Sequence, residues 1–309
     1  MNAEAPSAWR PAGPAAEALL GFTLVLSIGA ALIFVGTMAL LAIALRRPPS
    51  QVGARRWLLG GGVLFPLVVL VALFVYSVRH SPPWKAMPPA HALIVGVTGH
   101  MWWWELRYRD PRSGREVAAA NELRIPVGRP VYLGLSSADA IHSFWVPALG
   151  GKMDMLPGRM QHLLVQADRP GVFRGQCAEF CGTQHARMAL HVVAMAPADF
   201  DAWLDAQARP AAPAGAALQA GRDAFLAHRC DACHAVRGVS EGGRLGPDLT
   251  HVGSRLHLGA GTLPMGEAQL TDWIAHTQRH KPGALMPSSA QRIDEPSLRA
   301  IAAWLAQLK

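Results

Sequence analysis

Two long apolar runs without charged side chains stand near the start of the chain, at residues 18–45 and 57–78. An α-helix rises about 1.5 Å per residue, so the runs reach roughly 42 Å and 33 Å, enough to cross a hydrocarbon core about 30 Å thick. The pattern predicts a transmembrane hairpin over residues 18–78 with helices at 18–45 and 57–78. A cleaved signal peptide is the alternative for the first run, which is long for that role and has no basic segment before it.

The segment between the two runs carries arginine pairs at 46–47 and 55–56. Short cytoplasmic loops are enriched in Lys and Arg, so this loop is expected in the cytoplasm. An N-terminal segment, residues 1–17, and the chain after residue 78 then lie on the extracytoplasmic side. In a bacterium, that places the chain in the inner membrane with its larger part in the periplasm.

After residue 78 the pattern changes to short runs of Val, Leu, Ile and aromatic residues, separated by Gly, Pro, Asn and Asp. This alternation predicts a small antiparallel β-sandwich or barrel over residues 79–205, with a helix at 197–207 near its end. A Pro/Ala-rich stretch, residues 206–214, is expected to be a linker. From residue 215 apolar residues recur three and four apart, which predicts a mostly helical domain over 215–309.

Composition agrees with a membrane-bound chain and excludes one class of partner. Of the 309 residues, 51% are hydrophobic and 16% are charged, an apolar balance for a soluble protein. The net charge of +8 is spread along the chain, and no basic block exceeds a pair. The sequence therefore gives no sign of nucleic-acid binding.

Metal-binding side chains gather in a stretch of twelve residues at positions 177–188. Cys177, Cys181, His185 and Met188 supply two thiolates, an imidazole and a thioether. Soft sulfur ligands with imidazole favour copper or zinc, and the thioether favours copper. His142 is the candidate for a more remote ligand. A disulfide or a zinc loop is the alternative, but neither accounts for Met188.

A second cysteine cluster, Cys230, Cys233 and His234, forms C-x-x-C-H, the attachment motif of a c-type haem. The two cysteines would form thioethers to the haem, and His234 would be the proximal iron ligand. All four cysteines of the chain are used by the two clusters, so none remains for a separate disulfide.

Methionine is the expected second axial ligand of such a haem, because His/Met ligation is typical of cytochromes c. Met286 is preferred over Met265, since it stands about fifty residues after the motif and directly before a proline. A bis-histidine site using His257 or His280 is the alternative.

Three segments carry a family resemblance: GHMWWWEL at 99–106, IHSFWVPALGGKMDMLPGR at 141–159 and GQCAEFCGTQHARM at 175–188. Together they resemble subunit II of haem–copper cytochrome c oxidases. With the haem motif, the whole chain resembles the caa-type oxidases, in which subunit II carries a fused cytochrome c. The implied fold is that of a multidomain membrane protein: a two-helix transmembrane hairpin, an all-β cupredoxin-like barrel and an all-α class I cytochrome c domain.

The resemblance implies a binuclear copper centre, CuA, and a role for each residue that matches the family motif. Cys177 and Cys181 would bridge the two coppers, His142 and His185 would each bind one, and Met188 would be a weak ligand. The backbone carbonyl of Glu179 would bind the other copper. The Glu179 side chain would point toward a magnesium ion shared with subunit I.

The family also implies a function and partners. Electrons would pass from an external cytochrome c donor through haem c and CuA to the haem a and copper centres of subunit I, where oxygen is reduced to water with proton pumping. Subunit III is a further expected partner. The membrane helices contain no histidine cluster, so no oxygen chemistry is expected in this chain. Trp102 is the candidate that receives electrons near CuA, whereas Leu59 stands where many relatives have a Glu linked with proton uptake.

Two other functions remain open from the sequence. The chain fits a CuA-bearing small subunit of a nitric oxide reductase, because the acceptor lies in another subunit. It also fits a stand-alone membrane-anchored electron carrier, which would not need Glu179 or the loop at 150–159. A quinol oxidase is disfavoured, because that branch lacks the copper ligands.

Overall fold

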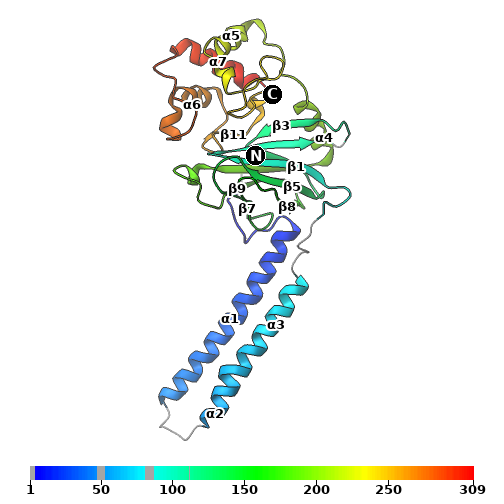
Figure 1. Ribbon diagram of the computed structural model, residues 1–309, viewed down its shortest axis with the longest axis vertical. Coiled ribbons are helices and arrows are strands. Elements are labelled where there is room, and N and C mark those ends of the chain that lie inside the picture. Colours follow the sequence, from blue (N-terminus) through cyan, green and yellow to red (C-terminus); the bar gives the residue numbers. More distant parts are fainter. Residues whose placement is uncertain (1–3, 47–52, 81–86, 111) are drawn as a thin grey trace. The chain divides into compact units, whose positions relative to one another are not determined.

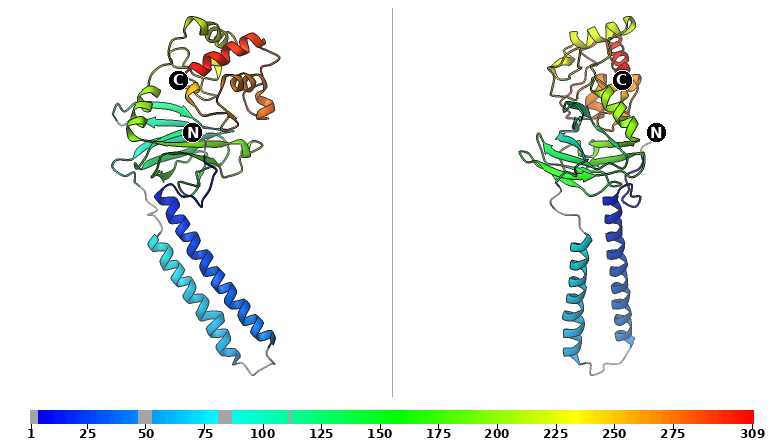
Figure 2. Two further views of the ribbon diagram at one scale, coloured as in Figure 1. Left: turned by 180° about the vertical axis from the view of Figure 1, so that it is seen from behind. Right: turned by 90° about the vertical axis from the view of Figure 1, so that its right-hand side faces the viewer.

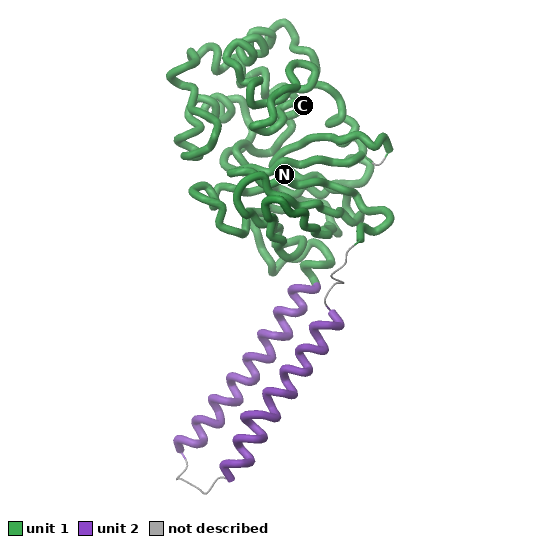
Figure 3. Tube along the Cα trace, in the orientation of Figure 1, with its two compact units in different colours: residues 1–17, 87–309 green, residues 18–86 purple. Residues whose placement is uncertain are grey.

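The structure is a computed structural model that describes residues 4–46, 53–80, 87–110 and 112–309. It contains two compact units, residues 1–17 with 87–309 and residues 18–86, which Figure 3 shows in different colours. The first unit holds all of the cysteines and the second holds most of the two apolar helices.

Two helices of membrane-spanning length form the apolar hairpin, as the hydropathy pattern predicts. The first is α1 (Pro14–Arg46), and the second runs from Ala54 to His80 through α2 (Ala54–Arg56), η1 (Trp57–Leu64) and α3 (Phe65–His80). The first helix begins four residues before the expected start at residue 18. Proline is favoured in a first helical turn, where its missing N–H leaves no bond unmade, and Pro14 takes that place. Arg47, in the predicted cytoplasmic loop, lies outside the described residues.

The second helix contains a widened π-helical stretch, η1, which ends two residues before Pro66. Proline lacks an N–H and its ring crowds the preceding turn, so the regular hydrogen-bond ladder is interrupted there. The Phe65 N–H instead bonds to the Gly60 carbonyl, five residues back. Within this unit Phe22 of α1 packs on Tyr76 of α3, with ring centres 5.0 Å apart.

Two five-stranded sheets form a β-sandwich (Figures 1 and 2). The first sheet has the order β3 (Glu116–Ala120), β2 (Trp103–Arg109), β1 (Leu93–His100), β5 (Val131–Ser137) and β8 (Gln161–Val165). The second has the order β4 (Glu122–Pro126), β10 (Ala189–Met195), β9 (Gly171–Cys177), β6 (His142–Trp145) and β7 (Met153–Met155). The sandwich is thus confirmed, but the purely antiparallel pairing is not: β1 pairs with β5 and β4 with β10 in parallel.

Alternating side chains of the strands fill the core between the sheets. In β1 and β5 every second residue is buried, as in Val95, Val97 and Leu133. Helix α4 (Pro197–Gln207) covers one end, where Phe200 and Trp203 pack on Tyr108.

The N-terminal segment also packs against the sandwich, a contact that the sequence pattern does not reveal. The Glu4 N–H bonds to the Val172 carbonyl at 2.8 Å, and the Ala12 N–H bonds to the Ala148 carbonyl at 2.7 Å. The carboxylate of Glu4 pairs with Arg169 at 2.7 Å. Both bonds and the ion pair fix this segment on the β-sandwich before α1 begins.

The C-terminal part is helical, as predicted, with helices α5 (Gln219–Ala227), α6 (Glu267–His280) and α7 (Glu295–Gln307). Short turns η3 (Ala216–Leu218), η4 (Cys230–Ala232) and η5 (Val252–Ser254) and a small hairpin, β11 (His257–Leu258) with β12 (Leu263–Pro264), complete it. Its hydrophobic cluster is separate from that of the sandwich and centres on Phe225 and Trp304, whose rings meet edge to face at 5.1 Å. Figure 1 shows these helices gathered beside the strands.

Candidate metal centre and haem site

Two thiols form the centre of the predicted copper site. Cys177 is the last residue of β9, and Cys181 follows in the loop that leads to η2 (His185–Arg187) and β10. Their sulfur atoms lie 3.8 Å apart, and both side chains are buried. The loop therefore turns two soft ligands toward one another, which the spacing of three residues between them allows.

The other predicted ligands surround these sulfurs. The Nδ1 atom of His142, from β6, lies 3.8 Å from the Cys177 sulfur, and that of His185 lies 3.7 Å from the Cys181 sulfur. The Met188 sulfur lies 3.8 Å from Cys181, and the Glu179 carbonyl accepts from the Cys177 thiol at 3.2 Å. Two thiols, two imidazoles, a thioether and a carbonyl are a donor set suited to copper. The residues therefore fit the group that the sequence predicts.

Hydrogen bonds shift the pKa values of the two thiols in opposite directions. The thiol of Cys181 and the imidazole of His142 lower the pKa of Cys177, despite its burial. The pKa of Cys181 is raised, because its proton is held by Cys177 and its side chain is buried. Metal binding would deprotonate both side chains, since cysteines bind metals as thiolates.

Asp139, a residue that the sequence analysis did not single out, orients His142. One carboxylate oxygen accepts from His142 Nε2 at 2.8 Å, and the other accepts from the Met101 N–H at 2.7 Å. Burial opposes protonation of His142, but Cys177 and Asp139 outweigh it and raise its pKa. With Nε2 held by Asp139, Nδ1 faces the sulfurs. The sequence signal for this role is an acidic residue, Asp139, three positions before His142.

Gly99 leaves room for the same imidazole. A Cβ atom at Gly99 would lie 2.7 Å from the His142 ring, closer than any side chain tolerates. The glycine in β1 is therefore required by the position of His142 across the sandwich.

Trp102 joins the copper loop to the helical part of the unit. Its indole Nε1–H donates to the carbonyl of Cys181 at 2.8 Å. Its side chain is only 8% exposed, and a Cβ at Gly283, beyond α6, would lie 3.6 Å from its ring. Trp103 instead stacks on His100, with ring centres 4.4 Å apart. The first tryptophan of the run is thus the one at the copper loop.

The haem-motif residues line a cavity of about 580 Å³ in the helical part. Cys230, Cys233, His234 and Met286 all contribute to its wall, whereas Met265 is not among the residues that line it. Of the alternative histidines, His280 pairs with Asp272 at 2.6 Å and lies outside the cavity wall. His257 reaches the wall but stacks on His191 of β10 at 4.2 Å. This arrangement favours Met286 as the partner of His234.

The surroundings of His234 fit a proximal haem ligand. Its Nδ1–H donates to the Pro247 carbonyl at 2.9 Å, which leaves Nε2 as the nitrogen available to iron. Burial lowers the pKa of His234, so the ring is held neutral, as a metal ligand must be. A Cβ at Gly246 would lie 2.4 Å from the ring, so this glycine allows the segment with Pro247 to pack on it.

The helical part is seated directly on the copper loop. Gln184 Nε2 donates to the Pro282 carbonyl at 2.8 Å, and the Ala189 N–H bonds to the Ala260 carbonyl at 3.1 Å. The Leu256 N–H donates to a carboxylate oxygen of Glu122 at 2.7 Å. We call this set of contacts between residues 254–261 and 280–283 and the sandwich the seam.

The side chain of Glu179 does not belong to the group of metal-binding side chains around the sulfurs. It is partly exposed and pairs with Lys152 at 3.2 Å. Within the described ranges, the one group of three or more candidate metal-binding side chains is His142, Cys177 and Cys181. A magnesium ion at Glu179 would therefore need further ligands from elsewhere.

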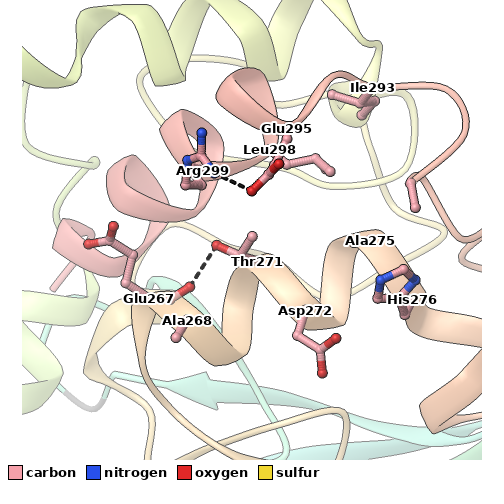
Figure 4. Close-up of a pocket in the computed structure, with 11 residues that line it drawn as sticks. Glu267, Ala268, Thr271, Asp272, Ala275, His276, Ile293, Glu295, Leu298 and Arg299 are labelled. Atoms are coloured by element: carbon pink, nitrogen blue, oxygen red, sulfur yellow. Dashed lines mark hydrogen bonds and ion pairs between the residues drawn. The ribbon is translucent and has the colours of Figure 1, made fainter.

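A second hollow, of about 760 Å³, lies between α6 and the start of α7 (Figure 4). Its wall contains Glu267, Asp272 and His276, and Arg299 pairs with Glu295 at its edge. None of the candidate haem or copper ligands belongs to it.

The fold and the two sites define the class: a membrane-anchored electron-transfer protein that joins a copper-binding β-sandwich to a cytochrome c domain. The family described as cytochrome c oxidase subunit II, periplasmic domain, matches residues 110–195, and the cytochrome c family matches residues 218–309. Cytochrome c oxidase subunit 2 of Alkalihalophilus pseudofirmus is 33% identical over 100% of this chain and 92% of its own length. The chain belongs to the cytochrome c oxidase subunit 2 family.

The chain is also similar to a second relative and to one solved structure. The subunit 2 of Bacillus subtilis is 28% identical over 80% of this chain and 71% of its own length. The solved periplasmic domain of subunit II of cytochrome oxidase (CoxB) of Bradyrhizobium japonicum is 30% identical, covers 40% of this chain and 97% of its own, and has a TM-score of 0.37. As a member of the subunit 2 family, the chain is an electron-transfer subunit of a haem–copper oxidase, with a membrane anchor, a periplasmic copper domain and a cytochrome c domain.

Proposed function

We propose that this chain carries electrons in a caa-type terminal oxidase of the bacterial inner membrane. An external cytochrome c, or a similar donor, reduces haem c, and the electron continues through CuA to the haem a and copper centres of subunit I. Oxygen is reduced to water there, coupled to proton pumping. Both bound groups supply one-electron redox chemistry, while the residues of this chain hold them in place.

The ligands of this proposal are the residues that surround the two sulfurs and the cavity. Copper is held by His142, Cys177, Cys181, His185, Met188 and the Glu179 carbonyl. Haem c is held by Cys230 and Cys233 as thioethers and by His234 and Met286 as axial ligands. The Glu179 carboxylate, beside Lys152, faces subunit I and contributes to a shared magnesium ion.

One observation carries the proposal: Trp102 belongs to both sites. Its ring forms part of the wall of the haem cavity, and its Nε1–H donates to the carbonyl of Cys181. Its small exposed fraction also supports a donor fixed within the chain, because the seam covers the surface that a separate cytochrome would need.

The external donor is then expected to act on the haem side. Leu285, which lies in the cavity wall, has 83% of its surface exposed, and Leu245 is exposed there as well. These leucines form an apolar rim at the cavity, and apolar surface beside a redox group suits a transient partner. The role of Trp102 is thereby refined: it receives the electron from the chain's own haem.

The membrane hairpin binds subunit I, and subunit III is a further partner. Leu59 lies in η1 of the second helix, so this chain offers no carboxylate at the place where many relatives have one. Proton uptake is therefore assigned to subunit I.

A reduced-minus-oxidised spectrum with haem extraction tests the function on the complex isolated through this chain in mild detergent. Haem c together with haem a is the expected result. Haem c with haem b alone would contradict the caa-type assignment and favour nitric oxide reduction or a b-type oxidase. Haem c without a partner subunit would leave an isolated electron carrier.

Cys177→Ser tests the copper ligands. The variant should lose the binuclear copper absorption and stop electron flow to subunit I, while covalent haem stays attached because its motif lies in the helical part. A normal copper spectrum in this variant would refute the assignment of Cys177 as a bridging ligand.

A further inference from the structure

Lys281 is a buried cation at the centre of the seam. It follows α6 and precedes Pro282 and Gly283 in the segment that leads to Met286. Only 3% of its surface is exposed. Among the residues that the structure describes, no carboxylate forms an ion pair with its ammonium group, so the usual reason for burying a lysine is missing.

Three backbone carbonyls take the place of a counter-ion. The Nζ atom donates to the carbonyls of Trp102 at 2.6 Å, Arg187 at 2.9 Å and Gly259 at 2.9 Å. An ammonium group has three donors, so each finds one acceptor. The acceptors come from three segments: the turn between β1 and β2, the copper loop directly before Met188, and the hairpin of the helical part.

Such a group is retained at a cost, because a buried charge loses its hydration. Burial lowers the pKa of Lys281 to about 7, against the opposing influence of Cys181. An apolar side chain of the same length would fill the space without this penalty. What it would lack is the ability to fix three carbonyls at one point.

Contacts on either side of Lys281 join the same segment to the copper loop. The carbonyls of His280 and Pro282, on either side of Lys281, accept from the side chains of Arg187 and Gln184 in the copper loop. Trp102 is therefore held at two places, by its own Nε1–H on Cys181 and by Lys281 on its carbonyl.

We propose that Lys281 is a positioning residue for electron transfer between the two cofactor sites, holding Trp102 and the copper loop at a fixed distance from the haem cavity. This inference rests on the proposed function. The step concerned moves one electron from the haem site to the copper site and makes or breaks no bond. Its rate depends on the separation that the three carbonyl contacts set.

The experiment uses the full chain in detergent, loaded with haem and copper, and compares two neutral variants. Lys281→Met removes all three donors and Lys281→Gln keeps two, so the pair separates hydrogen bonding from charge. Arg279→Met is the matched control, because Arg279 is a cation two residues away that is largely exposed and pairs with Asp272. Flash-induced reduction of the haem, followed at the haem and copper absorption bands, gives the transfer rate.

Lys281→Met should slow the transfer several-fold, since the rate of electron transfer falls steeply as the separation of donor and acceptor grows. The transfer rate of Lys281→Gln should lie between those of Lys281→Met and the parent chain. The rate of Arg279→Met should equal that of the parent chain. The haem and copper spectra should be unchanged in all three, and the amides of Ala189 and Leu256 at the seam should exchange hydrogen faster only in the Lys281 variants.

Three results would overturn the proposal. These are an unchanged rate in Lys281→Met, equal slowing in both Lys281 variants, or slowing fully explained by shifted midpoint potentials of the two cofactors. If Lys281→Met does not fold, Lys281→Gln alone decides, with an unchanged rate refuting the positioning role. A parent chain that holds both cofactors but shows no transfer between them would instead refute the proposed function.

Discussion

Acidification should open the seam, because two histidines stack across it. His191 of β10 and His257 of β11 lie face to face, with ring centres 4.2 Å apart and ring planes 9° apart. Burial, together with His257 and Arg174, lowers the pKa of His191 to about 4 from its usual 6.5. Burial also lowers the pKa of His257, although Glu122 partly offsets this effect.

The direction of the effect follows from these shifts. Opening the seam returns His191 to water and to its ordinary pKa, so below pH 6.5 the open form binds more protons than the closed form. The stabilisation that neutral His191 gives to the closed seam is complete above pH 6.5 and is lost as the pH falls toward 4. At about 1.4 kcal/mol per pKa unit, His191 alone accounts for about 3 kcal/mol in total and about 2 kcal/mol between pH 7 and pH 5. His257 acts in the same direction.

Hydrogen exchange at the Ala189 and Leu256 amides measures this opening, since both donate hydrogen bonds across the seam. After correction for intrinsic exchange, their protection should fall about 30-fold between pH 7 and pH 5. His191→Phe keeps a flat ring and should remove most of this dependence.

His162→Phe is the matched control, because His162 stacks on Tyr132 within the first sheet, away from the seam. This variant should behave like the parent chain. Equal protection of the parent chain at both pH values, or a fall in His191→Phe as large as in the parent, would refute the reasoning.

Three substitutions test the cofactor sites. Met286→Ala should keep covalent haem but lower its midpoint potential in a redox titration, because a thioether ligand is lost. Gly99→Ala should displace His142, destabilise the sandwich by about 1–3 kcal/mol in chemical denaturation and weaken the copper absorption. Gly246→Ala should disturb the contact of Pro247 with His234 and shift the haem spectrum at neutral pH.

Each of these has a control in the same segment or domain. Met265→Ala should leave the haem potential unchanged, and the opposite pattern would identify Met265 as the ligand. Gly96→Ala, in the same strand as Gly99, adds a Cβ at an ordinary 3.8 Å from Arg107 and should be tolerated. The control for Gly246→Ala is Gly242→Ala, because a Cβ added at Gly242 meets no atom within 4 Å. Equal effects of a glycine variant and its control would contradict the steric argument.

The features that the sequence predicts well are local ones. The apolar runs, the helical character of the chain after residue 215 and the C-x-x-C-H motif each depend on residues within about thirty positions of one another. The copper loop is also local, since Cys177 and Met188 stand on one short segment. Only His142 comes from farther away: the sequence offered it as a candidate remote ligand, and the resemblance to a family gave it the role of binding one copper.

Contacts between distant segments were not predictable in this way. Lys281 bonds to a carbonyl 179 residues away, and a lysine before a Pro-Gly turn normally lies in water. The parallel pairing of β1 with β5 and the packing of Glu4 on the sandwich depend equally on tertiary structure. Nothing in the hydropathy pattern around Lys281 or Glu4 distinguishes those segments from exposed loops, and the alternation in β1 and β5 does not fix the direction of their pairing.

The burial of both copper-loop thiols bears on the order in which the chain matures. Cys177 and Cys181 are almost inaccessible in the folded chain, packed in the core of the sandwich beneath a loop that Pro282 of the helical part contacts. A copper-delivering protein must therefore reach them before the two parts close, or must wait for them to separate. Assembly would then proceed in a set sequence, with metal loading as the step that precedes closure, and chains that close too early would accumulate haem but no copper.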